Sequence, residues 1–127
     1  MIRMLVADDH PVVRQRLKEL LLEGFPSAYL ELAVDTASLI DHALNEEWDI
    51  IISDLVMPGG GGLHAIKKIK EAKPSQVSIL ISIYPDEQYA SHALSAGATA
   101  FLNKNNADNE LIGMVNRLLG QVSNKAV

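Results

Sequence analysis

Acidic side chains follow two short apolar runs of this sequence. Asp8 and Asp9 come directly after residues 4–7, and Asp54 comes after the isoleucine-rich run 50–53. Short aliphatic runs of this kind are typical of buried strands in a parallel sheet, and such strands present ligand-binding residues at their carboxyl ends. We therefore expect the three carboxylates to meet at one edge of a sheet. Because close carboxylates repel each other, that edge requires a cation or a lysine.

A hydroxyl and a lysine are expected on the same edge. Ser82 stands late in a fourth strand-like run, and Lys104 follows a fifth. Oxygen ligands suit Mg²⁺ (or Mn²⁺), which keeps several waters and takes one or two carboxylates plus a phosphoryl oxygen. Asp54 stands alone at its strand end, and the backbone carbonyl of Val56 in the following loop is in position to add a metal ligand. A divalent ion, an ammonium group and a hydroxyl around a carboxylate predict that the carboxylate attacks a phosphoryl group as a nucleophile. Asp54 is the best candidate for this role.

Length and composition fit one globular domain. The chain has 127 residues, of which 48% are hydrophobic and 21% charged. Its net charge of −5 provides no basic footprint, so we do not expect this segment to bind nucleic acid directly. Cysteine is absent, which excludes disulfides and thiolate metal sites. The apolar runs are too short to span a bilayer and the start does not resemble a signal peptide, so we expect a soluble cytoplasmic protein without membrane contact.

Strand-like and helix-like patterns alternate along the chain, which favours parallel βα units. The expected strands are residues 2–7, 29–33, 50–53, 77–83 and 99–102. The expected helices begin at Pro11, cover 37–46, include Leu63 to Ile69, cover 87–96, and include Leu111 to Leu119. Right-handed crossovers wind this pattern into a three-layer α/β fold with a doubly wound parallel five-stranded sheet. We assign residues 1–121 to one domain and 122–127 to a tail or the start of a linker.

The positions of these motifs closely resemble the receiver domain of two-component response regulators over nearly the whole chain. The matching features are the acid pair Asp8-Asp9, the segment Asp54-x-x-Met57-Pro58-Gly59, the hydroxyl at Ser82 and the lysine at Lys104. Residues 96–104 and 86–89 also look like the receiver subgroup that is joined to a LuxR-type helix-turn-helix output domain. The resemblance implies a flavodoxin-like (βα)₅ fold.

The same resemblance implies metal-dependent phosphorylation. Asp54 would accept a phosphoryl group from a sensor histidine kinase or from a small phosphodonor. Asp9, Asp54 and the Val56 carbonyl would bind Mg²⁺ directly, and Asp8 would act largely through water. Lys104 would hold a phosphoryl oxygen. The protein would then be no conventional enzyme, although it would assist its own phosphoryl transfer and autodephosphorylation.

A switching role is also implied for two residues. Ser82 would move toward the phosphoryl group, and the aromatic ring of Phe101 would then turn inward. This change would alter self-association, as a homodimer formed on phosphorylation, or would alter an output such as transcription control. The output domain and the dimer surface are not identified by the sequence.

Two departures from the family pattern bear on the site. Ile83 is large where the family usually has a small residue, so we expect slower dephosphorylation or slower access of small donors. The run 59–62 consists of four glycines in place of an apolar and an acidic residue between two glycines. Such a run is unusually free in φ and costly to order, and we interpret it as a flexible turn.

Plainer interpretations and rival functions remain open. Either acid of the first pair can cap a helix, a strand serine and a loop lysine are often structural, and Phe101 can be a core residue. Histidines at 10, 42, 64 and 92 have no metal-binding spacing and are expected at the surface. One rival is an unphosphorylated receiver-like module that signals through partner binding. Another is a flavodoxin-like cofactor enzyme, which the missing phosphate-loop residues disfavour.

Overall fold

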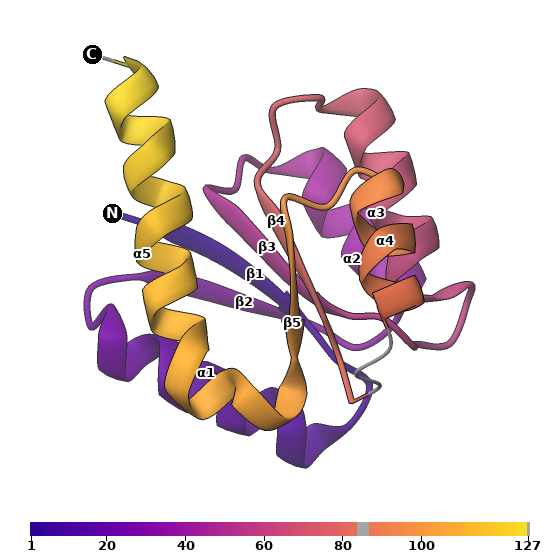
Figure 1. The fold of residues 1–127 in the computed structure, drawn as a ribbon, viewed down its shortest axis with the longest axis horizontal. Coiled ribbons are helices and arrows are strands. Elements are labelled where there is room, and N and C mark those ends of the chain that lie inside the picture. Colours follow the sequence, from indigo (N-terminus) through magenta and orange to yellow (C-terminus); the bar gives the residue numbers. More distant parts are fainter. Residues whose placement is uncertain (84–86, 127) are drawn as a thin grey trace.

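In the computed structural model, the backbone is described for residues 1–83 and 87–126 and the side chains for 1–83 and 90–120. Helices and strands alternate along the chain (Figure 1). The strands are β1 (Arg3–Ala7), β2 (Tyr29–Ala33), β3 (Ile50–Asp54), β4 (Ser78–Ser82) and β5 (Ala100–Asn103). The helices are α1 (Pro11–Gly24), α2 (Thr36–Asn45), α3 (Gly61–Ala72), α4 (Glu87–Ser95), the short 3₁₀ helix η1 (Lys104–Asn106) and α5 (Ala107–Ala126).

All five strands pair in parallel in the order β2-β1-β3-β4-β5. This order confirms the doubly wound, flavodoxin-like sheet that the alternating pattern predicts. β3 lies at the centre and every one of its residues is buried, as is every residue of β4. Because helices cover both faces, each of these strands carries three consecutive aliphatic residues rather than an alternating pattern.

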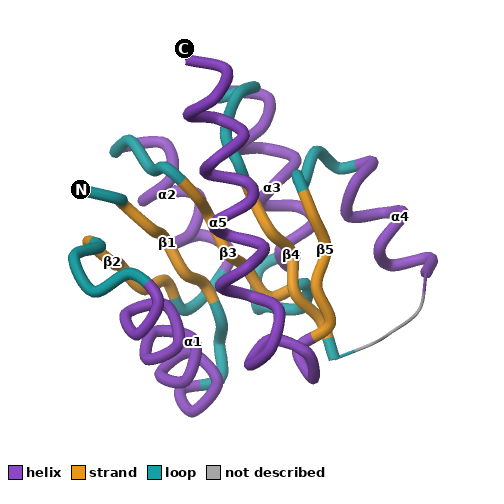
Figure 2. The backbone as a smooth tube through the Cα atoms, turned by 60° about the vertical axis from the view of Figure 1, so that its left-hand side comes forward, coloured by secondary structure: helices purple, strands orange, loops and turns teal. Residues whose placement is uncertain are grey.

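Two hydrophobic cores lie on the two faces of the sheet. On one face α1 and α5 pack against the strands, and on the other lie α2, α3 and α4 (Figures 1 and 2). Leu5 and Ile51 belong to the core beneath α2 and α3, whereas Met4 and Ile52 belong to the core beneath α1 and α5. Neighbouring strand residues therefore point to opposite cores, as the two-residue period of a strand requires.

Several element boundaries differ slightly from the expected ones. β3 extends to Asp54, so the acid itself belongs to the central strand. α3 begins at Gly61, two residues before the first apolar position of its helical pattern, because glycine conformations at the turn bring the chain into the helix early. The backbone of α5 continues as a helix to Ala126, and the proposed division at residue 121 stays a prediction.

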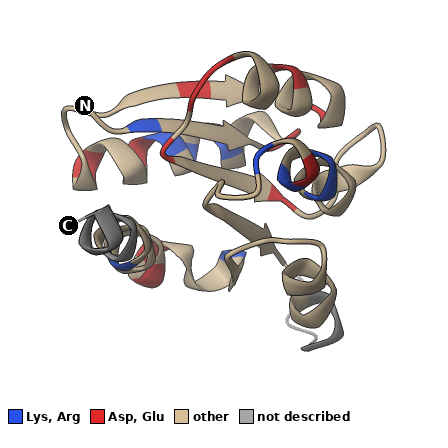
Figure 3. Ribbon diagram, turned by 90° about the horizontal axis from the view of Figure 1, so that it is seen from above, with Lys and Arg blue, Asp and Glu red and all other residues tan. Residues whose placement is uncertain are grey.

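The described residues show no membrane-spanning helix, since none is both long and apolar enough to cross a bilayer. Acidic and basic residues lie on several elements in the view of Figure 3, in keeping with the mixed charge of the chain.

Candidate functional site

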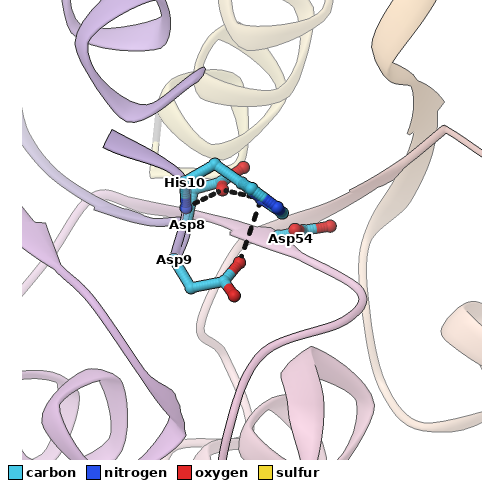
Figure 4. Close-up of side chains that lie close together, drawn as sticks. All are labelled: Asp8, Asp9, His10 and Asp54. Carbon is cyan, nitrogen blue, oxygen red and sulfur yellow. Dashed lines mark hydrogen bonds and ion pairs between the residues drawn. The ribbon is translucent and has the colours of Figure 1, made fainter. Parts of the chain in front are cut away.

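The three acids meet where β1 and β3 end. Asp8 and Asp9 follow β1, and Asp54 is the last residue of β3. One possible ligand atom from each of these acids, together with one from His10, lies within 4.8 Å of the others (Figure 4). The two strands pair in parallel, with Ala7 opposite Ser53, so their acids are brought to the same edge. This is the juxtaposition expected from the two apolar runs.

Lys104 lies between two of the buried acids. Its Nζ is 3.0 Å from Oδ2 of Asp8 and 3.0 Å from Oδ2 of Asp54. The Asp8 side chain is completely buried, and those of Asp54 and Lys104 are 6% and 12% exposed. Buried charges need a partner, and here one ammonium group serves two carboxylates. If all three aspartates of the cluster are ionised, two negative charges remain unbalanced.

The pKa values of Asp54 and Lys104 both lie above their ordinary values. Burial raises the pKa of Asp54, and the charge of Asp8 raises it further, whereas Lys104 only partly offsets these effects. Burial by itself would lower the pKa of Lys104, but hydrogen bonds and charge attraction from Asp54 and Asp8 outweigh it. Lys104 is therefore held as a cation, while the Asp54 anion is penalised by its surroundings.

A cavity of about 400 Å³ opens onto the cluster. Its lining residues are His10, Val13, Asp54, Val56, Ser82, Ile83 and Lys104. Ile83 is 55% exposed and Val56 is 59% exposed, so both contribute apolar surface to this cavity. Ile83 is thus placed where it was expected to restrict access. The backbone N–H of Val56 faces Oδ1 of Asp54 at 3.4 Å, and metal coordination by the Val56 carbonyl stays a prediction.

The two predicted switch residues lie on neighbouring strands. Ser82 is buried at the end of β4, opposite Asn103 of β5. Phe101 is opposite Leu80 in the same pair of strands and packs, partly buried, against the core beneath α2 and α3. Ser82 thus lines the site, whereas Phe101 lies two residues before the end of β5, and the coupled movement expected of them stays a prediction.

His10, which was expected to be a surface histidine, belongs to the cluster. Its Nδ1 lies 3.1 Å from Oδ1 of Asp9 and 3.3 Å from Oδ1 of Asp8, and its backbone N–H donates to the latter oxygen at 2.8 Å. The side chain is nevertheless 66% exposed. A signal was present in the sequence: His10 stands just before Pro11, at the N-cap of α1, where serine, threonine, aspartate or asparagine is preferred.

The glycine run has a defined conformation. Gly59, Gly60 and Gly61 have φ values of +95°, +114° and +84°, which residues with a side chain rarely adopt. The N–H of Gly61 donates to Oγ1 of Thr36 at 2.9 Å, and the N–H of Thr36 donates to the carbonyl of Pro58 at 3.1 Å. What was interpreted as a flexible turn is therefore anchored to the start of α2 by a buried threonine that sequence reasoning missed.

Position 62 requires glycine because it has no room for a side chain. A Cβ atom at this position would collide with the backbone carbonyl of Asp54 and would lie 2.8 Å from Cδ2 of Leu80. The first turn of α3 therefore packs directly on the end of β3, where Asp54 is located.

Comparison with known proteins points to one family. Residues 4–116 match the family model described as the response regulator receiver domain. The oxygen regulatory protein NreC of Staphylococcus carnosus is 33% identical over 114 residues, which cover 89% of this chain and 52% of that protein. The glycerol metabolism activator of Pseudomonas putida is 28% identical over 120 residues, or 94% of this chain and 54% of that protein. The chain thus spans about half the length of the curated relatives it matches.

Solved structures agree with this assignment. The response regulator TrrA of Thermotoga maritima, in complex with Mg²⁺ and BeF, is 30% identical with a TM-score of 0.83, covering 93% of this chain and 99% of that one. A two-component response regulator of the LuxR family from Aurantimonas is 26% identical with a TM-score of 0.86, covering 94% of this chain and 85% of that one. A CheY-like receiver from Methanospirillum hungatei, at 22% identity, shares the fold with a TM-score of 0.89 over 98% of both chains.

Proposed function

Since this chain belongs to the response regulator receiver family of two-component systems, we propose that Asp54 is the residue that accepts its phosphoryl group. The observation that carries this proposal is the position of Asp54 in the cavity wall, 3.0 Å from the Lys104 ammonium group. Burial makes the unneutralised Asp54 anion unfavourable. Phosphorylation converts this anion into an acyl phosphate whose charge lies farther out, next to a cation that is already in place.

The proposed reaction transfers one phosphoryl group. A carboxylate oxygen of Asp54 forms a bond to phosphorus, and the bond from phosphorus to the donor breaks, so that its electron pair leaves with the phosphohistidine nitrogen or the small-donor oxygen. Lys104 and the Ser82 hydroxyl hold the phosphoryl oxygens. Autodephosphorylation by water then resets the residue. The chain carries no other chemistry in this proposal and is not a conventional enzyme.

The residues at the edge of the sheet fit a hard divalent cation. Three carboxylates stand against one ammonium group, and oxygen ligands of this kind suit Mg²⁺ or Mn²⁺. We assign direct coordination to Asp9, Asp54 and the carbonyl of Val56, with Asp8 acting through water. The ion supplies neutralisation of the phosphoryl charge when it is bound.

The physiological setting follows from the same assignment. The donor is proposed to be a sensor histidine kinase in the cytoplasm. Phosphorylation would draw Ser82 toward the phosphoryl group and let Phe101 turn inward, which would change the surface around β5 and favour a homodimer. Transcription control through a further domain fits the regulatory proteins that this chain resembles over half of their length.

Incubation with acetyl phosphate and Mg²⁺, followed by intact mass measurement, tests the phosphoacceptor. The wild-type chain should gain one phosphoryl group, and Asp54→Asn should gain none. Asp41→Asn is the matched control, because Asp41 is an exposed aspartate of α2 outside the cluster.

Two results would contradict the proposal. Labelling that persists in Asp54→Asn would place the phosphoryl group elsewhere. Absence of labelling in the wild type with both acetyl phosphate and a cognate kinase would favour the module that signals without phosphorylation.

A further inference from the structure

The proposed phosphoryl transfer uses the carboxylates, Ser82 and Lys104, but it assigns nothing to the imidazole of His10. This side chain is two-thirds exposed, yet its Nδ1 faces the acid cluster rather than solvent (Figure 4). The ring also lines the cavity that contains Asp54. The imidazole is therefore in a position to take part in ligand binding at this cavity.

Helix capping does not explain the position of the ring. His10 is the N-cap of α1, but its side chain makes no cap hydrogen bond. The backbone on either side is fixed instead, because the His10 N–H donates to Asp8 and the His10 carbonyl accepts from the N–H of Arg14 at 2.9 Å. The side chain of Arg14 adds a hydrogen bond to the carbonyl of Asp8 at 2.8 Å. The base of the imidazole is therefore held beside the carboxylates, while the ring itself is not committed to the helix.

The spacing of the polar atoms is slightly wider than the coordination shell of one ion. Ligand atoms of Asp8, Asp9, His10 and Asp54 all lie within 4.8 Å of one another. Around an octahedral ion with bonds of about 2.1 Å, neighbouring ligands are about 3.0 Å apart and opposite ligands about 4.2 Å apart. The Nδ1 atom, at 3.1 Å from an Asp9 oxygen, already has the separation of neighbouring ligands. A small contraction of the set would bring the ligand atoms of Asp9, His10 and Asp54 onto one ion, with Asp8 acting through water as assigned above.

We propose that His10 supplies a nitrogen ligand to the carboxylate metal site, so that this receiver favours a borderline transition ion over Mg²⁺ more strongly than oxygen ligands alone would. The inference rests on the proposed function, because it concerns the same metal site. Imidazole nitrogen is a good ligand for ions such as Co²⁺, Ni²⁺ and Zn²⁺, whereas Mg²⁺ prefers oxygen and retains its waters. In the tautomer with its proton on Nε2, the ring presents a lone pair on Nδ1 to the ion.

Titration calorimetry with Co²⁺ and Mg²⁺ separately measures this preference. In His10→Gln, the Kd for Co²⁺ should rise by about tenfold or more while the Kd for Mg²⁺ changes by less than about twofold. His64→Gln is the matched control, since His64 is an exposed histidine of α3 outside the cluster and should change neither value. A loss of equal size for both ions, or no loss for Co²⁺, would overturn the proposal. Thermal unfolding of each variant confirms that the fold is retained.

A spectroscopic measurement reports the nitrogen ligand directly. The proton NMR spectrum of the Co²⁺-loaded wild type should contain a strongly shifted imidazole N–H resonance that is lost in His10→Gln and kept in His64→Gln. If this resonance is absent while Mg²⁺ supports phosphorylation of Asp54, the inference fails and the receiver function stands. If it is present while no donor phosphorylates Asp54, the phosphoacceptor assignment fails and the nitrogen ligand stands.

Discussion

Asp35 and Asp54 stand at comparable junctions, yet the fold treats their charges in opposite ways. Asp35 precedes α2 and accepts a hydrogen bond from the N–H of Ser38 at 2.8 Å, and hydrogen bonds from Ser38 lower its pKa. Asp54 ends β3, where burial raises its pKa. The Asp35 anion therefore stabilises the folded chain, whereas the Asp54 anion destabilises it. Groups with a pKa perturbed in this second way are frequent at functional sites.

The sign of this difference predicts opposite dependences of stability on pH. The folded chain holds the proton of Asp54 to a higher pH than the unfolded chain does, so its contribution to the free energy of unfolding falls as pH rises through the interval between the two pKa values. The contribution of Asp35 is fully present above its unfolded pKa and is lost as pH falls through its lowered folded pKa. The predictions below test this contrast, beginning with the largest expected effect.

Removing the cation beside Asp54 should have the largest effect on stability. Lys104→Met leaves Asp8 and Asp54 buried without their ammonium partner and should lower the free energy of unfolding at neutral pH by about 3 kcal/mol. Arg16→Met is the matched control, because the ion pairs of Arg16 with Glu19 and Asp108 are exposed and should contribute less than about 1 kcal/mol. Urea denaturation compares the two variants. Equal losses would mean that the Asp54 region is as solvated as the surface.

Thr36 connects the two regions, because it directly follows Asp35 and accepts the hydrogen bond of Gly61 in the turn after Asp54. Thr36→Val removes that acceptor from a buried N–H and should lower the free energy of unfolding by about 2 kcal/mol. Thr36→Ser keeps the hydroxyl and should lose less. Urea denaturation of both variants checks this expectation, which would be wrong if serine were no better than valine.

Matched replacements of the two aspartates should change stability in opposite directions. Without divalent metal at neutral pH, Asp54→Asn should raise the free energy of unfolding, because the penalty of burying the anion and its repulsion with Asp8 disappear. The gain should shrink as pH falls, since Asp54 of the wild type then becomes protonated. Urea denaturation of both proteins across a pH series measures this difference in the free energy of unfolding. A destabilised variant at neutral pH would contradict the inferred penalty on this anion.

Asp35→Asn should show the smallest effect, of the opposite sign. Asparagine still caps α2 but lacks the charge, so the urea midpoint should fall slightly at neutral pH. The difference from the wild type should vanish as pH falls through the folded pKa of Asp35. A difference that persists in strong acid would show that geometry, rather than charge, sets the contribution of this residue.

The arrangement of the acids was accessible from the sequence because it depends on strand ends. Asp8 and Asp54 each follow a short aliphatic run, and parallel strands bring such ends together wherever their exact boundaries lie. Lys104 follows the same rule. The five-stranded parallel sheet was predictable from the alternation of strand-like and helix-like patterns along the chain.

Other features depend on side-chain direction or on contacts between distant segments. His10 joins the cluster because its ring turns toward the acids, which residue spacing does not reveal. The hydrogen bond from the Gly61 N–H to the Thr36 hydroxyl joins the starts of two helices that lie 25 positions apart in the sequence. The early start of α3 depends on three left-handed glycines that precede its first apolar residue. None of these has a periodic pattern, and only His10 left a signal in the sequence, as an unusual residue type at a helix N-cap.

Gly62 has a consequence for how freely this protein can vary. Since a Cβ atom at this position would collide with the backbone carbonyl of Asp54 at the end of β3, even a single methyl group there would force α3 outward or displace Asp54. Alanine is the mildest replacement that most helical positions can receive, but here it would displace the backbone of Asp54, the proposed phosphoacceptor. Tolerance to mutation is therefore expected to be much lower at Gly62 than at Gly113, where an added Cβ atom would meet no neighbour within 4 Å.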